Sequence, residues 1–174
     1  MVLVGGVNNQ PSFSKVVSFF HQIPDIEAKF VRLYFQKSDK LITMTPRHLI
    51  LVAKTMTEPF EYIPAADVQP ENILKLFDQE LNEFRHIKVD HKEVVHENSG
   101  IFSPLTESGS LIVDDIQVSC FSIIKSHTIA QTAFNVLNYL GYLIEVSADS
   151  YVAYAKFLYD FIDQHQLKQV FLNL

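Results

Sequence analysis

The chain has 174 residues, of which 48% are hydrophobic and 12% aromatic, and its formal net charge is −6. This length is sufficient for a domain with a buried core, and the composition is typical of a globular protein, so a disordered chain is excluded. No cluster of basic residues provides the positive face that neutralises phosphates, and nucleic-acid binding is therefore excluded as well.

The N-terminal third of the chain predicts short strands separated by turns. The elements expected there are a strand at residues 2–4, an extended segment at 13–20, a strand at 29–36, a polar turn at 37–40 and a partner strand at 41–54. The hairpin that spans residues 29–54 is the best-defined element in the sequence.

The middle of the chain continues in the same way. Residues 57–69, with two prolines, predict a connecting loop, and residues 73–77 predict a strand, although apolar periodicity equally allows a helix at 73–84. Residues 85–97 alternate as a strand does. Two or three further strands are expected in 100–124, with turns at Gly109 and Asp114-Asp115. Many short strands between turn signals indicate a mainly β fold.

The character of the sequence changes after residue 124. Apolar residues repeat at helical spacing in 128–144 and in 148–166, which predicts an α-helical hairpin. We therefore expect two parts, a β module at residues 1–124 and a helical tail at 125–174. The 17 uncharged residues of 128–144 include Gln131, Asn135 and Asn138, too few and too polar for a membrane span, which needs about 20 apolar residues.

Residues 41–52 are unusual for a strand because they carry Thr45-Pro46-Arg47-His48 at their centre. Pro46 donates no backbone hydrogen bond and restricts Thr45 to an extended or turn conformation. We expect a kink that directs Thr45 and His48 towards one point, where an imidazole can polarise a carbonyl or protonate a leaving amine. The alternative is a polar strand end with a surface histidine, which this motif alone does not exclude.

Four blocks of sequence together carry a family resemblance. They are Phe19-Phe20-His21, residues 27–34, residues 41–52 with Thr-Pro-Arg-His-Leu, and residues 100–120 with Pro-Leu-Thr, a glycine, Val-Asp and Ser-Cys. In this order they resemble the Hint module in the C-terminal half of hedgehog and hedgehog-related proteins, especially the warthog and groundhog type. The resemblance covers about residues 2–124, and the last two blocks are specific as a pair.

The resemblance implies a Hint-like β module of short antiparallel strands that processes itself. In that family a cysteine at the first position of the module attacks the preceding carbonyl and forms a thioester. A second nucleophile, often a sterol hydroxyl, then takes the acyl group. By resemblance, His48 would hydrogen-bond the amide nitrogen of the scissile bond and Thr45 would hold the local geometry.

His21 stands where hedgehog proteins have the aspartate that activates the sterol hydroxyl. An imidazole can also act as a general base near neutral pH, so His21 is a further candidate catalytic residue, with water or another alcohol as the acceptor. The alternative is an exposed residue at a strand end.

Cys120 is the single cysteine, and it occupies the late Ser-Cys position of the family and not the first position of the module. Because the chemistry needs a thiolate, residues 1–174 as written are not expected to cleave themselves. We expect a truncated or inactive copy, or half of a split unit in which an upstream segment of the precursor or a separate chain supplies the missing cysteine strand. Cys120 has either a chemical role near the site or a packing role.

The alternative function is a non-catalytic module that binds a lipid or a protein. Its helical tail would contact a sterol or lipid adduct, or a membrane surface. The resemblance implies the secretory pathway, although residues 1–6 show no signal peptide. No cofactor is implied. No metal site is predicted either, because His86, His91, His96, His127 and His165 lack the spacing of metal ligands.

Overall fold

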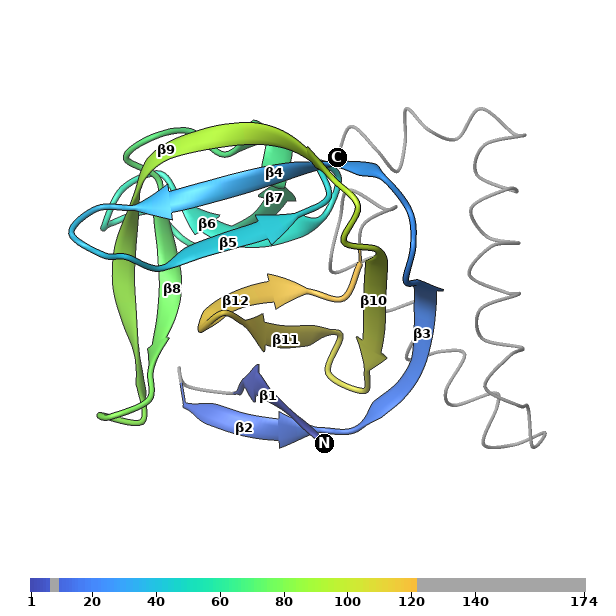
Figure 1. Ribbon diagram of the computed structural model, residues 1–174. Helices are drawn as coiled ribbons and strands as arrows, with labels where there is room; N and C mark the ends of the chain where they lie inside the picture. The colour runs from blue at the N-terminus through green and yellow to red at the C-terminus, as the bar shows by residue number, and fades with distance from the viewer. Residues whose placement is uncertain (7–9, 122–174) are drawn as a thin grey trace, which may run out of the picture.

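The computed structural model describes residues 1–6 and 10–121, and at Phe20 and His21 it describes the backbone alone. These residues form twelve strands and a short 3-10 helix, η2 (Figure 1). The elements are β1 (Val2–Gly5), β2 (Pro11–Ser14), β3 (Val16–Ile23), β4 (Ala28–Phe35), β5 (Leu41–Met44), β6 (Leu49–Ala53), β7 (Glu61–Pro64), η2 (Ala65–Asp67), β8 (Ile73–Asp78), β9 (Glu83–Glu97), β10 (Ile101–Thr106), β11 (Ser110–Val113) and β12 (Ile116–Ser119). The expected helical hairpin and the boundary at residue 124 lie outside the described residues.

All the strand pairs are antiparallel, and the mainly β fold expected from the sequence is confirmed. The largest sheet has the order β11-β12-β6-β8-β9-β4-β5, with β7 paired to β6, while β1 pairs with β2 and β3 with β10. The 15-residue strand β9 curves across the molecule in Figure 1, pairing first with β8 and then with β4. It thereby joins the two halves of the sheet.

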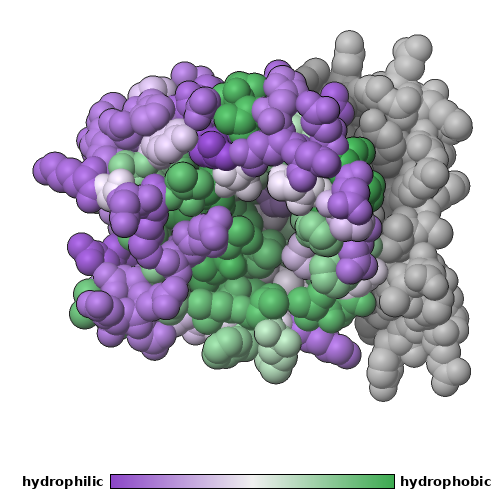
Figure 2. Space-filling model, viewed as in Figure 1, coloured by the Kyte–Doolittle hydropathy of each residue, from purple (hydrophilic) through white to green (hydrophobic). Residues whose placement is uncertain are grey.

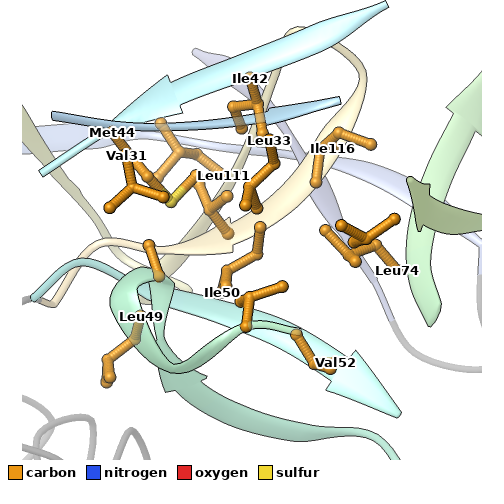
Figure 3. Close-up of a cluster of buried hydrophobic side chains, with 14 of the residues drawn as sticks. Val31, Leu33, Ile42, Met44, Leu49, Ile50, Val52, Leu74, Leu111 and Ile116 are labelled. Atoms are coloured by element: carbon orange, nitrogen blue, oxygen red, sulfur yellow. The ribbon is translucent and has the colours of Figure 1, made fainter. Parts of the chain in front are cut away.

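The hydrophobic core lies where β4, β5 and β6 meet β11 and β12. Figure 3 shows side chains from these strands directed towards one another: Val31, Leu33, Ile42, Met44, Ile50, Leu111 and Ile116. All five residues of β6 are buried, which accounts for its unbroken apolar sequence, since a strand covered on both faces does not alternate. The core therefore fixes the position of the segment just before β6, which is the Thr-Pro-Arg-His motif.

The structure corrects the expected hairpin at residues 29–54. Only Leu41–Met44 pairs with β4, and the chain then turns, so that Leu49–Ala53 pairs with β7, β8 and β12 instead. The predicted kink is thus a complete change of partner strand. The sequence does not reveal this change of partner strand, because apolar residues continue on both sides of the turn.

Two further expectations about the middle of the chain are settled. The loop expected at residues 57–69 contains β7 and η2, which were missed because β7 is short and ends at a proline. Residues 73–78 form a strand and not a helix, with a turn before Glu83 in which Asn82 has a φ of 53°. Leu81, which the helical alternative places on the apolar face, is 60% exposed.

Candidate acyl-transfer site

Residues 45–48 form a β-turn between β5 and β6. The His48 backbone N–H donates to the Thr45 carbonyl oxygen at 3.0 Å. Pro46 occupies the second position of the turn, where its fixed φ is favourable. The first two residues of η2 donate backbone hydrogen bonds to the carbonyl oxygens of His48 and Pro46, at 2.8 and 2.9 Å. The turn is therefore stabilised by one hydrogen bond of its own and by two hydrogen bonds from η2.

The His48 ring connects this turn to the end of β12. Its Nε2 lies 2.7 Å from the Ser119 carbonyl oxygen. A carbonyl oxygen only accepts, so Nε2 carries the hydrogen and Nδ1 of the neutral ring carries the lone pair. Burial lowers the pKa of His48 below its ordinary value of 6.5, and the hydrogen bond to Ser119 opposes that effect in part. At neutral pH, His48 is therefore an uncharged base.

A cavity of about 880 Å³ adjoins the turn, and Thr45 and His48 both line it. Its walls also include Phe30, Ile42, Met44, Glu97, Ser99–Pro104, Leu111, Val113 and Val118. Figure 2 shows hydrophobic side chains gathered in a hollow on this face of the molecule, with hydrophilic side chains around much of it. The cavity thus brings the predicted pair Thr45 and His48 beside a mainly apolar space.

Two of the strands that line the cavity, β5 and β10, are edge strands. Within the described residues, β5 pairs with β4 alone and β10 with β3 alone. An edge strand presents backbone N–H and C=O groups that a further strand can pair with. The space between β5 and β10 is therefore suited to an extended polypeptide segment.

The backbone of His21 lies beside a residue that lines this cavity. In the pairing of β3 with β10, His21 is opposite Ser103, which lines the cavity. Its side chain is not described, so its role as a general base stays a prediction.

Cys120 is buried, 1% exposed, and does not line the cavity. Its Sγ lies 3.3 Å from the Thr106 hydroxyl, which itself lies 2.8 Å from the Ser110 carbonyl oxygen. The Thr106 hydrogen goes to that carbonyl, so the thiol donates to Thr106. Burial raises the pKa of Cys120, which keeps the thiol protonated. This environment fits the packing alternative for Cys120.

The structure also describes the surroundings of His91 and bears on metal binding and membrane spans. His91 stacks on Tyr34 with ring centroids 4.3 Å apart, and its Nδ1 is 2.7 Å from Asp90. No group of three His, Cys, Asp or Glu side chains in residues 1–6 and 10–121 could hold a metal ion. The described part of the chain also contains no helix with the length and apolar character needed to cross a membrane.

A scan against family models matches residues 2–172 to the Hint module. The chain belongs to the Hint module family. The resemblance inferred from the Thr-Pro-Arg-His and Ser-Cys blocks is thereby confirmed, and in the structure the two blocks are in contact, since His48 hydrogen-bonds the backbone of Ser119. Sequence reasoning could not identify Ser119 as a partner, because its contribution is a carbonyl group, which any residue type provides.

Two curated relatives illustrate the similarity of this Hint chain to hedgehog-related proteins. Warthog protein 1 of Caenorhabditis elegans is 32% identical over 124 residues, which cover 71% of this chain and 25% of the relative. Sonic hedgehog protein of Xenopus laevis is 28% identical over 138 residues, covering 76% of this chain and 31% of the relative. The chain therefore spans about a quarter to a third of the length of these relatives.

Solved structures give the same fold. An intein from a hyperthermophile aligns with a TM-score of 0.55 at 16% identity, covering 68% of this chain and 70% of the intein. The transcription factor IIB Mvu mini-intein aligns with a TM-score of 0.54 at 14% identity and the same coverage. The described β module accordingly has the Hint fold shared with inteins.

Proposed function

We propose that this chain provides the acyl-transfer site of a hedgehog-type autoprocessing unit. The proposal is carried by one contact, the 2.7 Å hydrogen bond from His48 Nε2 to the Ser119 carbonyl oxygen. That contact joins the two sequence blocks on which the family resemblance depends, and it does so at the wall of a cavity that Thr45 also lines.

The nucleophile comes from polypeptide outside residues 1–174. Cys120 is the single cysteine of these residues, and its buried, protonated thiol lies away from the cavity lining. We propose that an extended segment bearing a cysteine pairs with the edge strand β5 or β10 beside the cavity. It belongs either to the upstream part of the same precursor or to a separate chain. Without that segment the chain cleaves nothing.

The proposed first step is an N-to-S acyl shift. The thiol sulfur attacks the carbonyl carbon of the preceding residue, a C–S bond forms, and the C–N bond of the scissile amide breaks. The thiol proton passes to the leaving nitrogen, which becomes a free amine. The Nδ1 lone pair of neutral His48 can take this proton and return it to the amine, a general base and acid role typical of histidine.

The burial of His48 suits this role. A lowered pKa keeps the ring uncharged before the reaction, while the Nε2–H bond to Ser119 fixes the orientation of the ring and steadies its charged form. We assign to Thr45, at the first position of the same turn, the task of holding the scissile amide in place. These roles follow the family resemblance and fit the geometry of the turn.

The second step transfers the acyl group from sulfur to oxygen. A hydroxyl oxygen attacks the thioester carbon, a C–O bond forms, the C–S bond breaks, and the thiol regains a proton. We propose water or a lipid alcohol as the acceptor, with His21 as its base. Likeness to hedgehog proteins also leads us to propose a secretory precursor and a lipid-contacting role for residues 125–174.

A fusion protein tests this function. The opening segment of a warthog Hint module, which begins with Cys-Phe, is placed before Met1 and preceded by a reporter domain. Dithiothreitol intercepts thioesters, so we expect it to release the reporter domain. Gel electrophoresis and mass spectrometry measure this release. The same fusion with the added cysteine changed to alanine is the control. A folded fusion that releases no reporter contradicts the proposal and leaves a binding module.

A further inference from the structure

Ser103 in β10 has a polar group that the fold does not use. The residue is 5% exposed, and its Oγ is buried without a hydrogen-bond partner. Two other buried hydroxyls in the described part of the chain do have partners. Ser14 Oγ accepts from the Ser108 backbone N–H at 3.1 Å, and Thr106 Oγ1 donates to the Ser110 carbonyl oxygen at 2.8 Å. The stability of the β module alone therefore does not account for a serine at position 103.

The location of Ser103 suggests what the hydroxyl is for. Ser103 lines the same cavity as Thr45 and His48. The pairing of β10 with β3 also shifts register immediately after it, between Ser103 and Pro104. Such bulges redirect side chains and are frequent beside active sites. The Ser103 side chain can rotate about its Cα–Cβ bond among three staggered positions, so the direction of Oγ can adjust to a partner in the cavity.

The cost of an unpaired hydroxyl favours a hydrogen-bond partner for Ser103 that belongs to a bound segment. A buried hydroxyl without a partner is unfavourable, and native proteins contain few of them, so each one calls for an explanation. An extended segment beside β10 presents backbone N–H and C=O groups along its whole length. Such a segment would also exclude water and strengthen a hydrogen bond to Ser103.

We propose that Ser103 is a binding residue of the cavity, and that its hydroxyl hydrogen-bonds a backbone amide group of the cysteine-bearing segment. The proposal rests on the proposed function, because the occupant is the same segment. Ser103 therefore lowers the stability of the protein when the cavity is empty, and it raises the affinity of the protein for the segment.

Thermal unfolding of the full chain without any ligand tests the first half of this claim. Ser103→Ala removes the unpaired hydroxyl, and we expect its melting temperature to rise by about 2–4 °C. Ser14→Ala is the matched control, a buried serine whose Oγ is satisfied and which does not line the cavity. Its melting temperature should fall. A melting temperature for Ser103→Ala that is below that of the unchanged protein overturns the proposal.

Peptide binding tests the second half. The probe is a fluorescent synthetic peptide with the opening segment of a warthog Hint module, its cysteine replaced by serine to prevent reaction. By fluorescence anisotropy, Ser103→Ala should bind about three- to tenfold more weakly than the unchanged protein, and Ser14→Ala should bind equally well. Equal binding by Ser103→Ala overturns the Ser103 assignment and leaves the proposed function intact. If the unchanged protein does not bind the peptide, both proposals fail.

Discussion

The hydrogen bond from His48 to Ser119 makes a prediction about stability that separates its structural role from its chemical one. His48→Gln keeps an N–H donor at the position of Nε2 and removes the titratable group. His48→Ala removes the donor and leaves the Ser119 carbonyl oxygen, in a residue with 0% exposure, without this partner. Losing a hydrogen bond to a buried acceptor costs about 0.5–1.5 kcal/mol. Each kcal/mol lowers the melting temperature of a chain of this size by about 2–4 °C.

The two variants should also differ from the unchanged protein in how stability depends on pH. The pKa of His48 is lower in the folded protein than in the unfolded chain, so the unfolded state binds the proton first as the pH falls. The stabilisation is complete above the unfolded value of about 6.5 and is lost as the pH falls from there to the folded pKa. Within that window the slope from this one group approaches about 1.4 kcal/mol per pH unit.

Urea unfolding, monitored by circular dichroism from about pH 8 to about pH 5, measures this effect. The difference in unfolding free energy between the unchanged protein and His48→Gln removes the contribution of the other six histidines. We expect that difference to change with pH in favour of His48→Gln under acidic conditions, and we expect His48→Ala to be the least stable of the three near pH 8. Parallel curves for the unchanged protein and His48→Gln would refute a buried, neutral His48.

Three further predictions concern the surroundings of the site. Gly100→Ala should lower the free energy of unfolding in urea by more than about 1–2 kcal/mol, because Gly100 has a φ of +74° and a Cβ there would lie 2.5 Å from the Pro24 carbonyl oxygen. A change within experimental error contradicts this prediction. Thr106→Val should lower the free energy of unfolding by about 0.5–1.5 kcal/mol, because it removes the stronger of two hydrogen bonds to the Ser110 carbonyl and leaves only the one from Ser108 Oγ at 3.3 Å; an unchanged unfolding midpoint argues against that bond. Cys120 should react with Ellman's reagent at least about tenfold more slowly in the native protein than in denaturant, and equal rates would mean an accessible thiolate.

Local chemistry predicted the turn that interrupts the apolar run. Pro46 in an apolar run indicated an interruption between Thr45 and His48, and the structure has a closed β-turn there. The family resemblance paired that block with the Ser-Cys block, and the two meet through His48 and Ser119. These features depend on residues close in sequence or on motifs specific enough to be recognised.

Features that depend on distant parts of the chain were not predictable in the same way. The exchange of partner strands after the turn is set by burial of both faces of β6, which an apolar sequence cannot report. The ion pair of Arg32 with Glu97, a residue that lines the cavity, depends on the register of β4 with β9. The unpaired hydroxyl of Ser103 was not predictable either. A serine near the end of a strand is ordinary in sequence, and only the packing around it shows that its hydroxyl has no partner.

The most direct test of the acyl-transfer account is the rate of dithiothreitol-dependent reporter release from two fusions that are equally folded at neutral pH. One has the unchanged chain and the other has His48→Gln, which keeps the hydrogen bond to Ser119 but cannot exchange a proton with the scissile amide. The account predicts that the substitution slows release by about 10²–10⁴-fold, the range typical of a lost general acid or base. Equal rates of release from the two fusions would contradict it.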